Sequence, residues 1–271
     1  MDYLKLLFIC ILINSTIAQD TESKNISSRF SSDVQKTVVG AYHVISAPSD
    51  WSSDDWIFLG AIASGSLVSF FLENNIREIF ARNRGNFADA LGNFGEIYGE
   101  PITVVALTGG IYAYGLFLDN PDARNTAIMM TVALIPGGVI QTAAKIAAGR
   151  ARPLSGADHD LFKPFSRSEN YYSFVSGHTL VAMSISLVLA EQFHSMPVKI
   201  ALYSLGAIGG LSRVYQDDHW FSDVLLGAAL SWACVRSSSN WLNKNKPGGD
   251  RKNLSLLFNV TSKQISFSLV W

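Results

Sequence analysis

The sequence predicts an all-α fold: a six-helix bundle, which we expect to be transmembrane, followed by a C-terminal β-hairpin. Three observations support this prediction. Six apolar stretches of about 15–22 residues approach the length of a helix that crosses a bilayer. Charged residues make up 16% of the chain, against about 25% in a typical soluble domain. Near the end of the chain the hydrophobic period changes from helical spacing to strict alternation, which is typical of strands.

Residues 1–18 resemble a secretory signal peptide. Lys5 gives the basic start, a short apolar run follows, and Ala18 ends a plausible cleavage site. An uncleaved membrane anchor is the alternative. Residues 19–55 are polar, and we expect them to form a loose leader on the surface. Removal of the signal would leave Cys234 as the one cysteine, which excludes an internal disulfide.

The helical bundle is expected over residues 56–236, with small residues frequent in its apolar stretches. Small residues let helices approach closely, which suits membrane packing. The shorter stretches would also fit the core of a soluble bundle, but stretch length and low charge favour the membrane bundle. Residues 73–100 form a polar connection with apolar residues at helical spacing, expected to lie on the bundle or at the interface. The apolar stretches are 56–72, 101–118, 126–147, 173–193, 198–212 and 221–236.

The region after the bundle divides into two parts. Residues 237–252 are polar and contain Pro247-Gly248-Gly249, which predicts a linker. In residues 253–271 apolar residues alternate in two runs, separated by Thr261 to Gln264, and this predicts a β-hairpin. An isolated hairpin is marginally stable in water, so we expect it to pack against another surface.

Charge and composition limit the classes of partner. The formal net charge is −1, so we expect no nucleic-acid partner. No cluster of carboxylates in the sequence suggests a metal site, and we expect neither a metal nor another cofactor.

The first polar cluster lies near the end of the third apolar stretch and contains Lys145, Arg152 and Pro153. Seven residues are nearly two helical turns, so Lys145 and Arg152 would face the same way. Pro153 disfavours helix at the residue before it, so the helix should end at Arg152. A guanidinium grips two phosphate oxygens and lysine acts as a point charge. Cations that reach for a membrane surface are the alternative explanation.

The second cluster, Ser176-Gly177-His178, opens the fourth apolar stretch. Gly177 permits an unusual backbone angle or close approach of a ligand. The free N–H groups of a helix N-terminus form a natural phosphate cradle, and the Ser176 hydroxyl can add a hydrogen bond. His178 is placed to give or take a proton. Taken alone, these residues are better explained by an ordinary turn with a structural histidine.

The third cluster joins Ser212-Arg213 to His219 and Asp223 at the start of the sixth stretch. Four residues separate His219 from Asp223, which places both on one face if they share a helix. A carboxylate bonded to one ring nitrogen leaves the other nucleophilic, and Arg213 supplies a further phosphate ligand. A structural histidine–aspartate pair is the alternative.

The three clusters taken together support a functional pocket more strongly than any one of them does. In a bundle of alternating helix direction, the third and fifth stretches end where the fourth and sixth begin. Nothing about burial alone requires polar clusters at all of these ends. We therefore expect one pocket lined by Lys145, Arg152, Ser176, Gly177, His178, Arg213, His219 and Asp223.

On these residues the chain resembles the type 2 phosphatidic acid phosphatase (PAP2) superfamily, which includes class A acid phosphatases and vanadium haloperoxidases. That family's signature is K-x6-R-P, then P-S-G-H, then S-R-x5-H-x3-D. The resemblance spans roughly 126–236, and the three motifs in order make it specific. One departure is Val175, where the family usually has proline, which puts the rigidity of that turn in doubt.

The resemblance implies a mechanism. His219 would attack phosphorus in line, and Asp223 would orient it. His178 would protonate the leaving oxygen and then activate water. Cations would replace the metal that many phosphatases use. The phosphoryl oxygens would be held by Lys145, Arg152 and Arg213, with Ser176 and the Gly177 amide.

The resemblance also implies a phosphorylated lipid as substrate and the membrane of a bacterial cell envelope as location, with the site facing the periplasm or exterior. A cleaved signal followed by six spans would instead turn the site inward, so the topology stays open. A soluble periplasmic acid phosphatase and a haloperoxidase are alternatives within the fold. A non-catalytic transport or lipid-binding protein is the alternative from another class. His43, His159 and His194 lie outside the clusters, and the loop holding His159 and Arg167 is expected to be solvated.

Overall fold

The computed structural model describes residues 26–244, 255–261 and 264–270. The predicted signal peptide lies outside these residues. Short 3-10 turns cover Ala47–Asp50, Pro153–Ser155 and Glu169–Tyr171. The α-helices of the described residues are α2 (Ile26–Ser46), α3 (Ser53–Phe70), α4 (Glu73–Arg82), α5 (Asn86–Gly99), α6 (Pro101–Phe117), α7 (Pro121–Ala148), α8 (Gly177–Ala190), α9 (Met196–Tyr215) and α10 (Phe221–Lys244).

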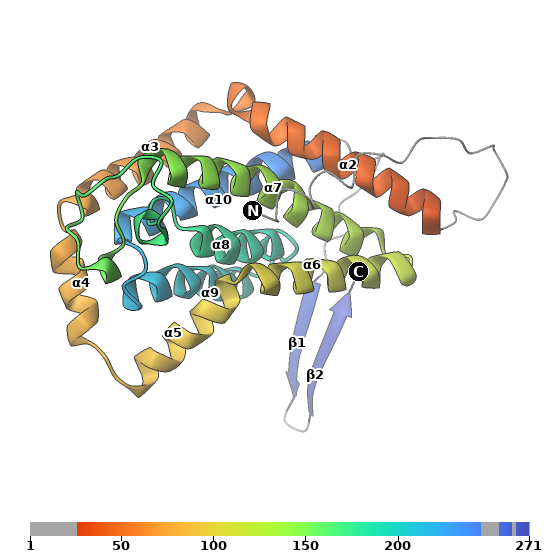
Figure 1. Ribbon diagram of the computed structural model, residues 1–271. Coiled ribbons are helices and arrows are strands. Elements are labelled where there is room, and N and C mark those ends of the chain that lie inside the picture. The colour runs from red at the N-terminus through yellow and green to blue at the C-terminus, as the bar shows by residue number, and fades with distance from the viewer. Residues whose placement is uncertain (1–25, 245–254, 262–263, 271) are drawn as a thin grey trace.

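The core of the bundle lies where α7, α8 and α10 meet. Helix α8 packs against α7, α9 and α10, and Figure 1 shows it running through the middle of the helical body. Met130 and Val132 of α7 and Ile185 and Val188 of α8 are fully buried there. Burial of side chains of this size is the main favourable term in folding, so these helices form the rigid frame on which the polar ends are placed.

The helical class predicted from sequence is confirmed, but the count of six is wrong. Each of the six apolar stretches lies on a helix: α3, α6, α7, α8, α9 and α10. Three more helices, α2, α4 and α5, form in segments that the sequence analysis treats as a leader and a connection. In those segments apolar residues are spread among polar ones, so hydropathy alone does not reveal a helix.

Residues 26–46 form a packed helix rather than a loose leader. Helix α2 lies along α7 and α10. Its buried Asp33 accepts a hydrogen bond from the hydroxyl of Tyr112 at 3.2 Å and pairs with Nε of Arg124 at 3.1 Å. A Cβ atom on Gly40 would stand 2.7 Å from the ring of Trp241. The polar contacts of Asp33 and the close packing at Gly40 therefore hold α2 against the bundle. The sequence has no apolar run there that would predict a packed helix.

The connection at 73–100 forms two helices that make a V, seen at the lower left of Figure 1. Helix α5 packs closely on α9. A Cβ atom on Gly95 would lie 2.6 Å from the carbonyl oxygen of Ile208, so a larger residue there would push the helices apart. The V places the end of α5 and the start of α4 beside the polar helix ends described below.

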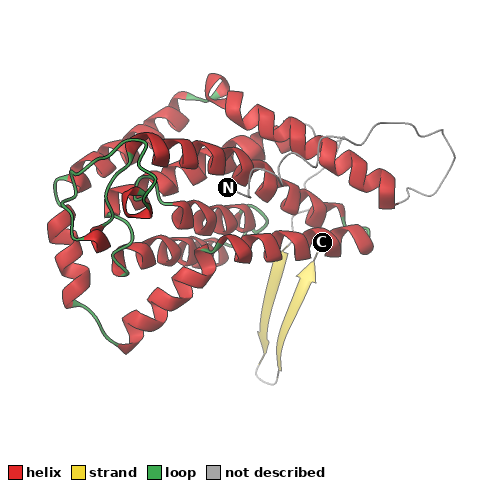
Figure 2. Ribbon diagram, in the orientation of Figure 1, coloured by secondary structure: helices red, strands yellow, loops and turns green. Residues whose placement is uncertain are grey.

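The predicted linker at 237–252 is partly helical. Helix α10 continues to Lys244, and the Ser238 hydroxyl donates to the carbonyl of Met129 at 3.1 Å. Strands β1 (Ser255–Thr261) and β2 (Gln264–Val270) pair antiparallel, and Figure 2 shows them in yellow. Their Cα partners include Leu256 with Leu269 and Val260 with Ile265. The surface against which this pair packs stays a prediction.

Six membrane spans stay a prediction as well. Within the part of the chain that the structure describes, α7 alone is long and apolar enough to cross a membrane by itself, and half of its apolar window is buried. Helices α3 and α4 meet the same criterion only together, with a bend of 77° between them. Helices α6 and α8 are apolar but have 17 and 14 residues.

Candidate active site

The three polar clusters meet at one end of the bundle, on the left of Figure 1. There α7 and α9 end, and α8 and α10 begin. The backbone N–H of Ser176 donates to the carbonyl of Asp223 at 3.2 Å, which joins the second cluster to the third. Nη1 of Arg152 donates to Oδ1 of Asp218 at 2.9 Å, which joins the first to the third. The convergence expected from sequence is therefore present in the structure.

The end of α7 differs from the prediction. The helix stops at Ala148 because Gly149 adopts φ +57°, in the left-handed region that glycine occupies readily. A Cβ atom there would stand 1.9 Å from the carbonyl oxygen of Lys163, so only glycine fits. Lys145 and Arg152 consequently do not share a helix face. Lys145 lies on the last turn of α7, whereas Arg152 extends from the loop beyond it.

His219 lies in the turn between α9 and α10 and is 3% exposed. Its Nδ1 is 2.6 Å from the carbonyl oxygen of Ser173. A carbonyl only accepts hydrogen bonds, so Nδ1 carries the proton and Nε2 keeps its lone pair. Burial and the positive charges of Lys145, Arg152 and Arg213 hold the pKa of His219 well below its usual value. The imidazole is therefore neutral near pH 7 and has a nucleophilic nitrogen.

The Asp223 carboxylate makes no hydrogen bond to His219 in the described structure, contrary to the expectation. Because α10 begins at Phe221, His219 precedes the helix and the four-residue spacing does not place the two on one face. The Asp223 carboxylate accepts from Nη1 of Arg150 at 2.7 Å, from the Ser173 hydroxyl at 2.5 Å and from the Trp220 N–H at 3.3 Å. Asp223 thus fixes Ser173, whose carbonyl in turn fixes the ring of His219.

Arg213 is the clearest mark of an anion site. The guanidinium is almost fully buried, and Nη2 donates to Oδ2 of Asp218. Its Nε and Nη1 are buried without a hydrogen-bond partner among the described residues. A buried donor left unsatisfied costs about 1–3 kcal/mol, and more when it is charged. Such donors fit an anion that binds beside His219.

The start of α8 provides further donors. Ser176 caps the helix: its hydroxyl oxygen accepts from the Thr179 hydroxyl at 2.9 Å and keeps its own proton to donate. Gly177 is the first residue of α8 and has a helical backbone, so the unusual angle considered from sequence is not used. The turn that lacks the family's proline is held instead by Gln141, whose Nε2 donates to the Val175 carbonyl at 2.7 Å.

His178 follows on the same helix and is half-buried. Its Nε2 is 3.4 Å from Oε1 of Glu100, at the junction between α5 and α6. The ring also lies within electrostatic reach of Arg213 and Lys145. Burial and then the positive charge of Arg213 lower the pKa of His178, and the carboxylate of Glu100, which favours the protonated ring, offsets part of that shift.

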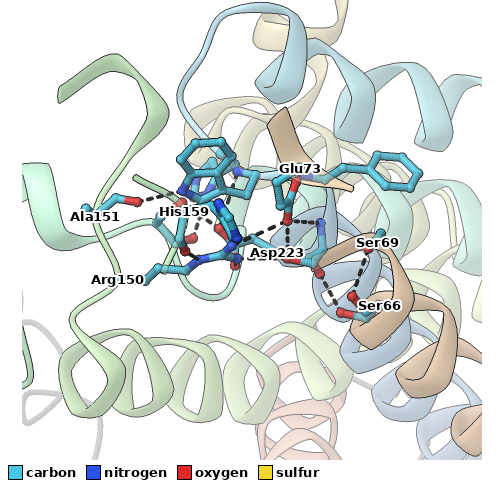
Figure 3. A network of polar contacts seen from close by, with 12 residues as sticks. Ser66, Ser69, Glu73, Arg150, Ala151, His159 and Asp223 are labelled. Atoms are coloured by element: carbon cyan, nitrogen blue, oxygen red, sulfur yellow. Dashed lines mark hydrogen bonds and ion pairs between the residues drawn. The ribbon is translucent and has the colours of Figure 1, made fainter. Parts of the chain in front are cut away.

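Sequence reasoning missed the buried residues behind His219, which Figure 3 shows pointing toward a shared centre. Arg150 is 1% exposed and donates to Asp223, to the Ser222 hydroxyl at 2.8 Å and to the His159 carbonyl at 2.9 Å. Its Nη2 also reaches Glu73 at 3.4 Å. Position 150 lies inside the first motif, which could have drawn attention to it, whereas Glu73 has no such signal.

The loop that holds His159 is largely exposed, as expected, but the His159 side chain is partly buried. Its ring packs edge-on against Phe70 at 5.0 Å and Trp220 at 6.0 Å between ring centroids. Arg167, in the same loop, is exposed as predicted. Within the described residues, no group of three histidine, cysteine, aspartate or glutamate side chains is placed to hold a metal ion.

A family model described as the PAP2 superfamily matches residues 126–247. Over these residues, which make up less than half of the chain, the sequence matches the PAP2 superfamily. The match covers α7 to α10 and contains all eight residues predicted to line the site. The family resemblance inferred from the three motifs is thereby confirmed.

The chain is also similar to individual proteins. The chain is 28% identical over 176 residues to a lipid A 1-phosphatase of Porphyromonas gingivalis, covering 62% of this chain and 34% of the relative. The chain thus spans about a third of the length of that curated relative. The fold resembles LpxE of Aquifex aeolicus, with a TM-score of 0.51 and 18% identity over 62% of this chain and 95% of that one.

The fold also resembles a transmembrane PAP2-type phosphatidylglycerolphosphate phosphatase of Bacillus subtilis. The TM-score is 0.54 at 19% identity, over 76% of this chain and 98% of that chain. At these identities the two structures support the arrangement of helices and nothing finer.

Proposed function

We propose that this PAP2 protein is a phosphatase that hydrolyses a phosphate monoester or diphosphate of a membrane lipid. The reaction needs no metal and passes through a phospho-histidine on His219. One observation carries the proposal: a neutral buried imidazole lies beside buried guanidinium donors of Arg213 that have no partner among the described residues. A nucleophile next to hydrogen-bond donors that can hold an anion is what phosphoryl transfer requires.

In the first step Nε2 of His219 attacks phosphorus, and the bond from phosphorus to the lipid oxygen breaks. His178 gives its proton to that oxygen, so a monoester leaves as the lipid alcohol and a diphosphate leaves as the lipid monophosphate. The Ser173 carbonyl accepts from Nδ1 and supports the positive charge that develops on the ring. Pre-oriented groups of this kind lower the barrier because they need no rearrangement during the reaction.

In the second step His178, now neutral, takes a proton from a water molecule whose oxygen attacks phosphorus. The phosphorus–nitrogen bond breaks, inorganic phosphate leaves and His219 is neutral again. Lys145, Arg152 and Arg213 hold the phosphoryl oxygens in both steps, with the Ser176 hydroxyl and the Gly177 amide. Their positive charges take the place that a metal ion has in many other phosphatases.

A lipid substrate is supported by the surface and by the relatives. Large apolar side chains are exposed on α3, α5 and α6, including Ile57 at 68%, Ile97 at 65% and Ile102 at 70%. Contiguous apolar surface marks contact with a membrane or another protein. The similar proteins named above include a lipid A 1-phosphatase and a phosphatidylglycerolphosphate phosphatase. We place the protein in the membrane of the bacterial cell envelope, with the site facing the periplasm or exterior.

A soluble periplasmic phosphatase of broad specificity is the second candidate, because α7 is the one described helix that meets the criterion for a span by itself. Extraction separates the two. A membrane enzyme stays in the membrane fraction until detergent is added, whereas a soluble one is recovered without detergent.

The test is release of phosphate from a panel of lipid and soluble phosphates in the presence of a chelator. Suitable lipids are phosphatidic acid, phosphatidylglycerophosphate, a polyprenyl diphosphate and a phosphorylated glycolipid. We expect turnover of at least one lipid, inhibition by vanadate, and loss of activity in His219→Ala with an unchanged circular dichroism spectrum. Activity that needs an added divalent metal would contradict the mechanism. Retained activity in His219→Ala would rule out His219 as the nucleophile, and absence of phosphate release by the wild-type protein would leave a transport or lipid-binding role.

A further inference from the structure

Helix α4 lies outside the segment that matches the superfamily, yet it reaches the turn that carries His219. We call residues 216–220, which join α9 to α10, the His219 turn. Glu73, Arg77, Asp217 and His219 line the same small cavity. Two charged side chains of α4 bind the backbone and side chains on either side of the histidine.

Glu73 holds the side that follows His219. The carboxylate is 1% exposed and accepts hydrogen bonds from the backbone N–H of Phe221 at 2.9 Å and of Ser222 at 3.1 Å. It also accepts from the Ser222 hydroxyl. The first N–H groups of a helix have no partner within it, so Glu73 caps α10 from another helix. Its negative charge also suits the positive end of the α10 dipole.

Arg77 holds the side that precedes His219. Nε donates to Oδ1 of Asp217 at 2.8 Å and Nη2 donates to Oδ2 at 3.2 Å, a two-pronged contact that fixes orientation. Asp217 has φ +60°, and its carbonyl accepts from the Leu154 N–H at 2.8 Å. The Arg77 guanidinium also lies 5.9 Å from the centre of the Trp220 ring.

The two side chains are four residues apart on α4, so they project from one face of the helix. We propose that this face is a positioning device for His219: Glu73 and Arg77 hold the His219 turn from its two sides and set the place of the attacking nitrogen. The inference rests on the proposed phosphatase activity. A displacement of about 1 Å in a reacting group can lower a rate about a hundredfold, so this contact influences the chemical step although α4 touches no substrate.

The primary variant is Arg77→Met, because Arg77 and Asp217 are partly exposed and their loss should leave the fold intact. We expect kcat to fall about tenfold with KM changed less than about twofold, since the phosphate-binding cations stay in place. Asp217→Asn keeps a residue type that tolerates positive φ and should give the same loss. The double variant should be no worse than either single one, because both remove one interaction. Arg77→Lys, which keeps the charge, should recover part of the rate.

The matched control is Arg82→Met. Arg82 lies on the same helix but pairs with Glu78 on the exposed surface, away from the His219 turn. This variant should retain the wild-type kcat. Equal thermal unfolding temperatures for both arginine variants would exclude a general loss of stability as the cause.

Two inhibitors separate positioning from binding. Vanadate mimics the five-coordinate state that includes the His219 nitrogen, whereas inorganic phosphate depends on the cations alone. Arg77→Met should weaken vanadate inhibition about tenfold and leave phosphate inhibition unchanged. An active enzyme in which Arg77→Met matches Arg82→Met in kcat and in vanadate inhibition would overturn the inference. Absence of wild-type activity, or activity retained in His219→Ala, would instead overturn the proposed function.

Discussion

Arg150 and Arg213 are both buried at the end of the bundle that holds His219. They differ in how fully their guanidinium groups are hydrogen-bonded. Every nitrogen of the Arg150 guanidinium that points inward meets a protein acceptor: Asp223, Ser222, Glu73 or the His159 carbonyl. Arg213 has one carboxylate partner and two buried nitrogens without any among the described residues. Burial is similar, so it is hydrogen-bond satisfaction that separates a supporting arginine from one reserved for a ligand.

The strongest test of this comparison is Arg150→Met. The change leaves the buried carboxylates of Asp223 and Glu73 without their cation, and removal of one partner of a buried pair destabilises by about 3–5 kcal/mol. We expect a lowered free energy of unfolding, measured with denaturant in detergent, and activity lost together with the fold. A variant within about 1 kcal/mol of wild type, as for an exposed pair, would show that Arg150 is not a structural arginine.

The reverse outcome is expected for Arg213→Met. Loss of an electrostatic donor to the transferred group lowers kcat about 10²–10³-fold. The unfolding temperature should stay the same or rise, because two unsatisfied buried donors disappear. Steady-state kinetics and thermal unfolding on one preparation check both statements. A large fall in stability would place Arg213 in the same class as Arg150.

The pH dependence of activity extends the comparison to Arg152. Burial, and then Lys145, Arg152 and Arg213, lower the pKa of His219. In Arg152→Met one of these charges is gone, so the pKa of His219 rises. In the proposed mechanism only neutral His219 attacks, and kcat/KM should therefore begin to fall at a higher pH on acidification than in wild type. Arg167→Met, in the exposed part of the same loop, serves as control and should leave the acid limb unchanged.

The smallest effect is expected for Ser173→Ala. The variant loses the hydroxyl that donates to Asp223 but keeps the carbonyl that accepts from His219. We expect a loss of about 1 kcal/mol in stability and a kcat within about threefold of wild type. A fall in kcat as large as that of Arg213→Met would mean that the hydroxyl, and through it Asp223, does more than hold the loop.

The sequence predicted those features that depend on residues near one another in the chain. Apolar stretches located six helices, and three motifs located the residues at their polar ends, because length and spacing along the chain determine both. The relation between His219 and Asp223 was wrong for a local reason too: α10 begins at Phe221, two residues later than a shared helix face requires. The end of α7 was misplaced because Gly149, not Pro153, stops the helix.

The remainder of the site depends on contacts between distant segments. Glu73 reaches residues almost 150 positions away, and the separation of 149 to Ser222 leaves no periodic signal. A single glutamate at the start of a polar connection has the same appearance whether it is solvated or buried. Helix α2 was missed similarly, since its buried positions include Asp33 and Gly40, which a hydropathy pattern does not select.

The carboxylate of Asp218 binds Arg152 and Arg213 at once. Two guanidinium groups placed close enough to bind one doubly charged ligand repel each other. A site that contained only cations would also bind inorganic phosphate tightly and release it slowly after hydrolysis. A fixed negative charge between them lowers that retention while it keeps the pair aligned. For the proposed hydrolysis, we therefore expect Asp218 to weaken binding of the ground state and to speed release of the product, which favours repeated turnover.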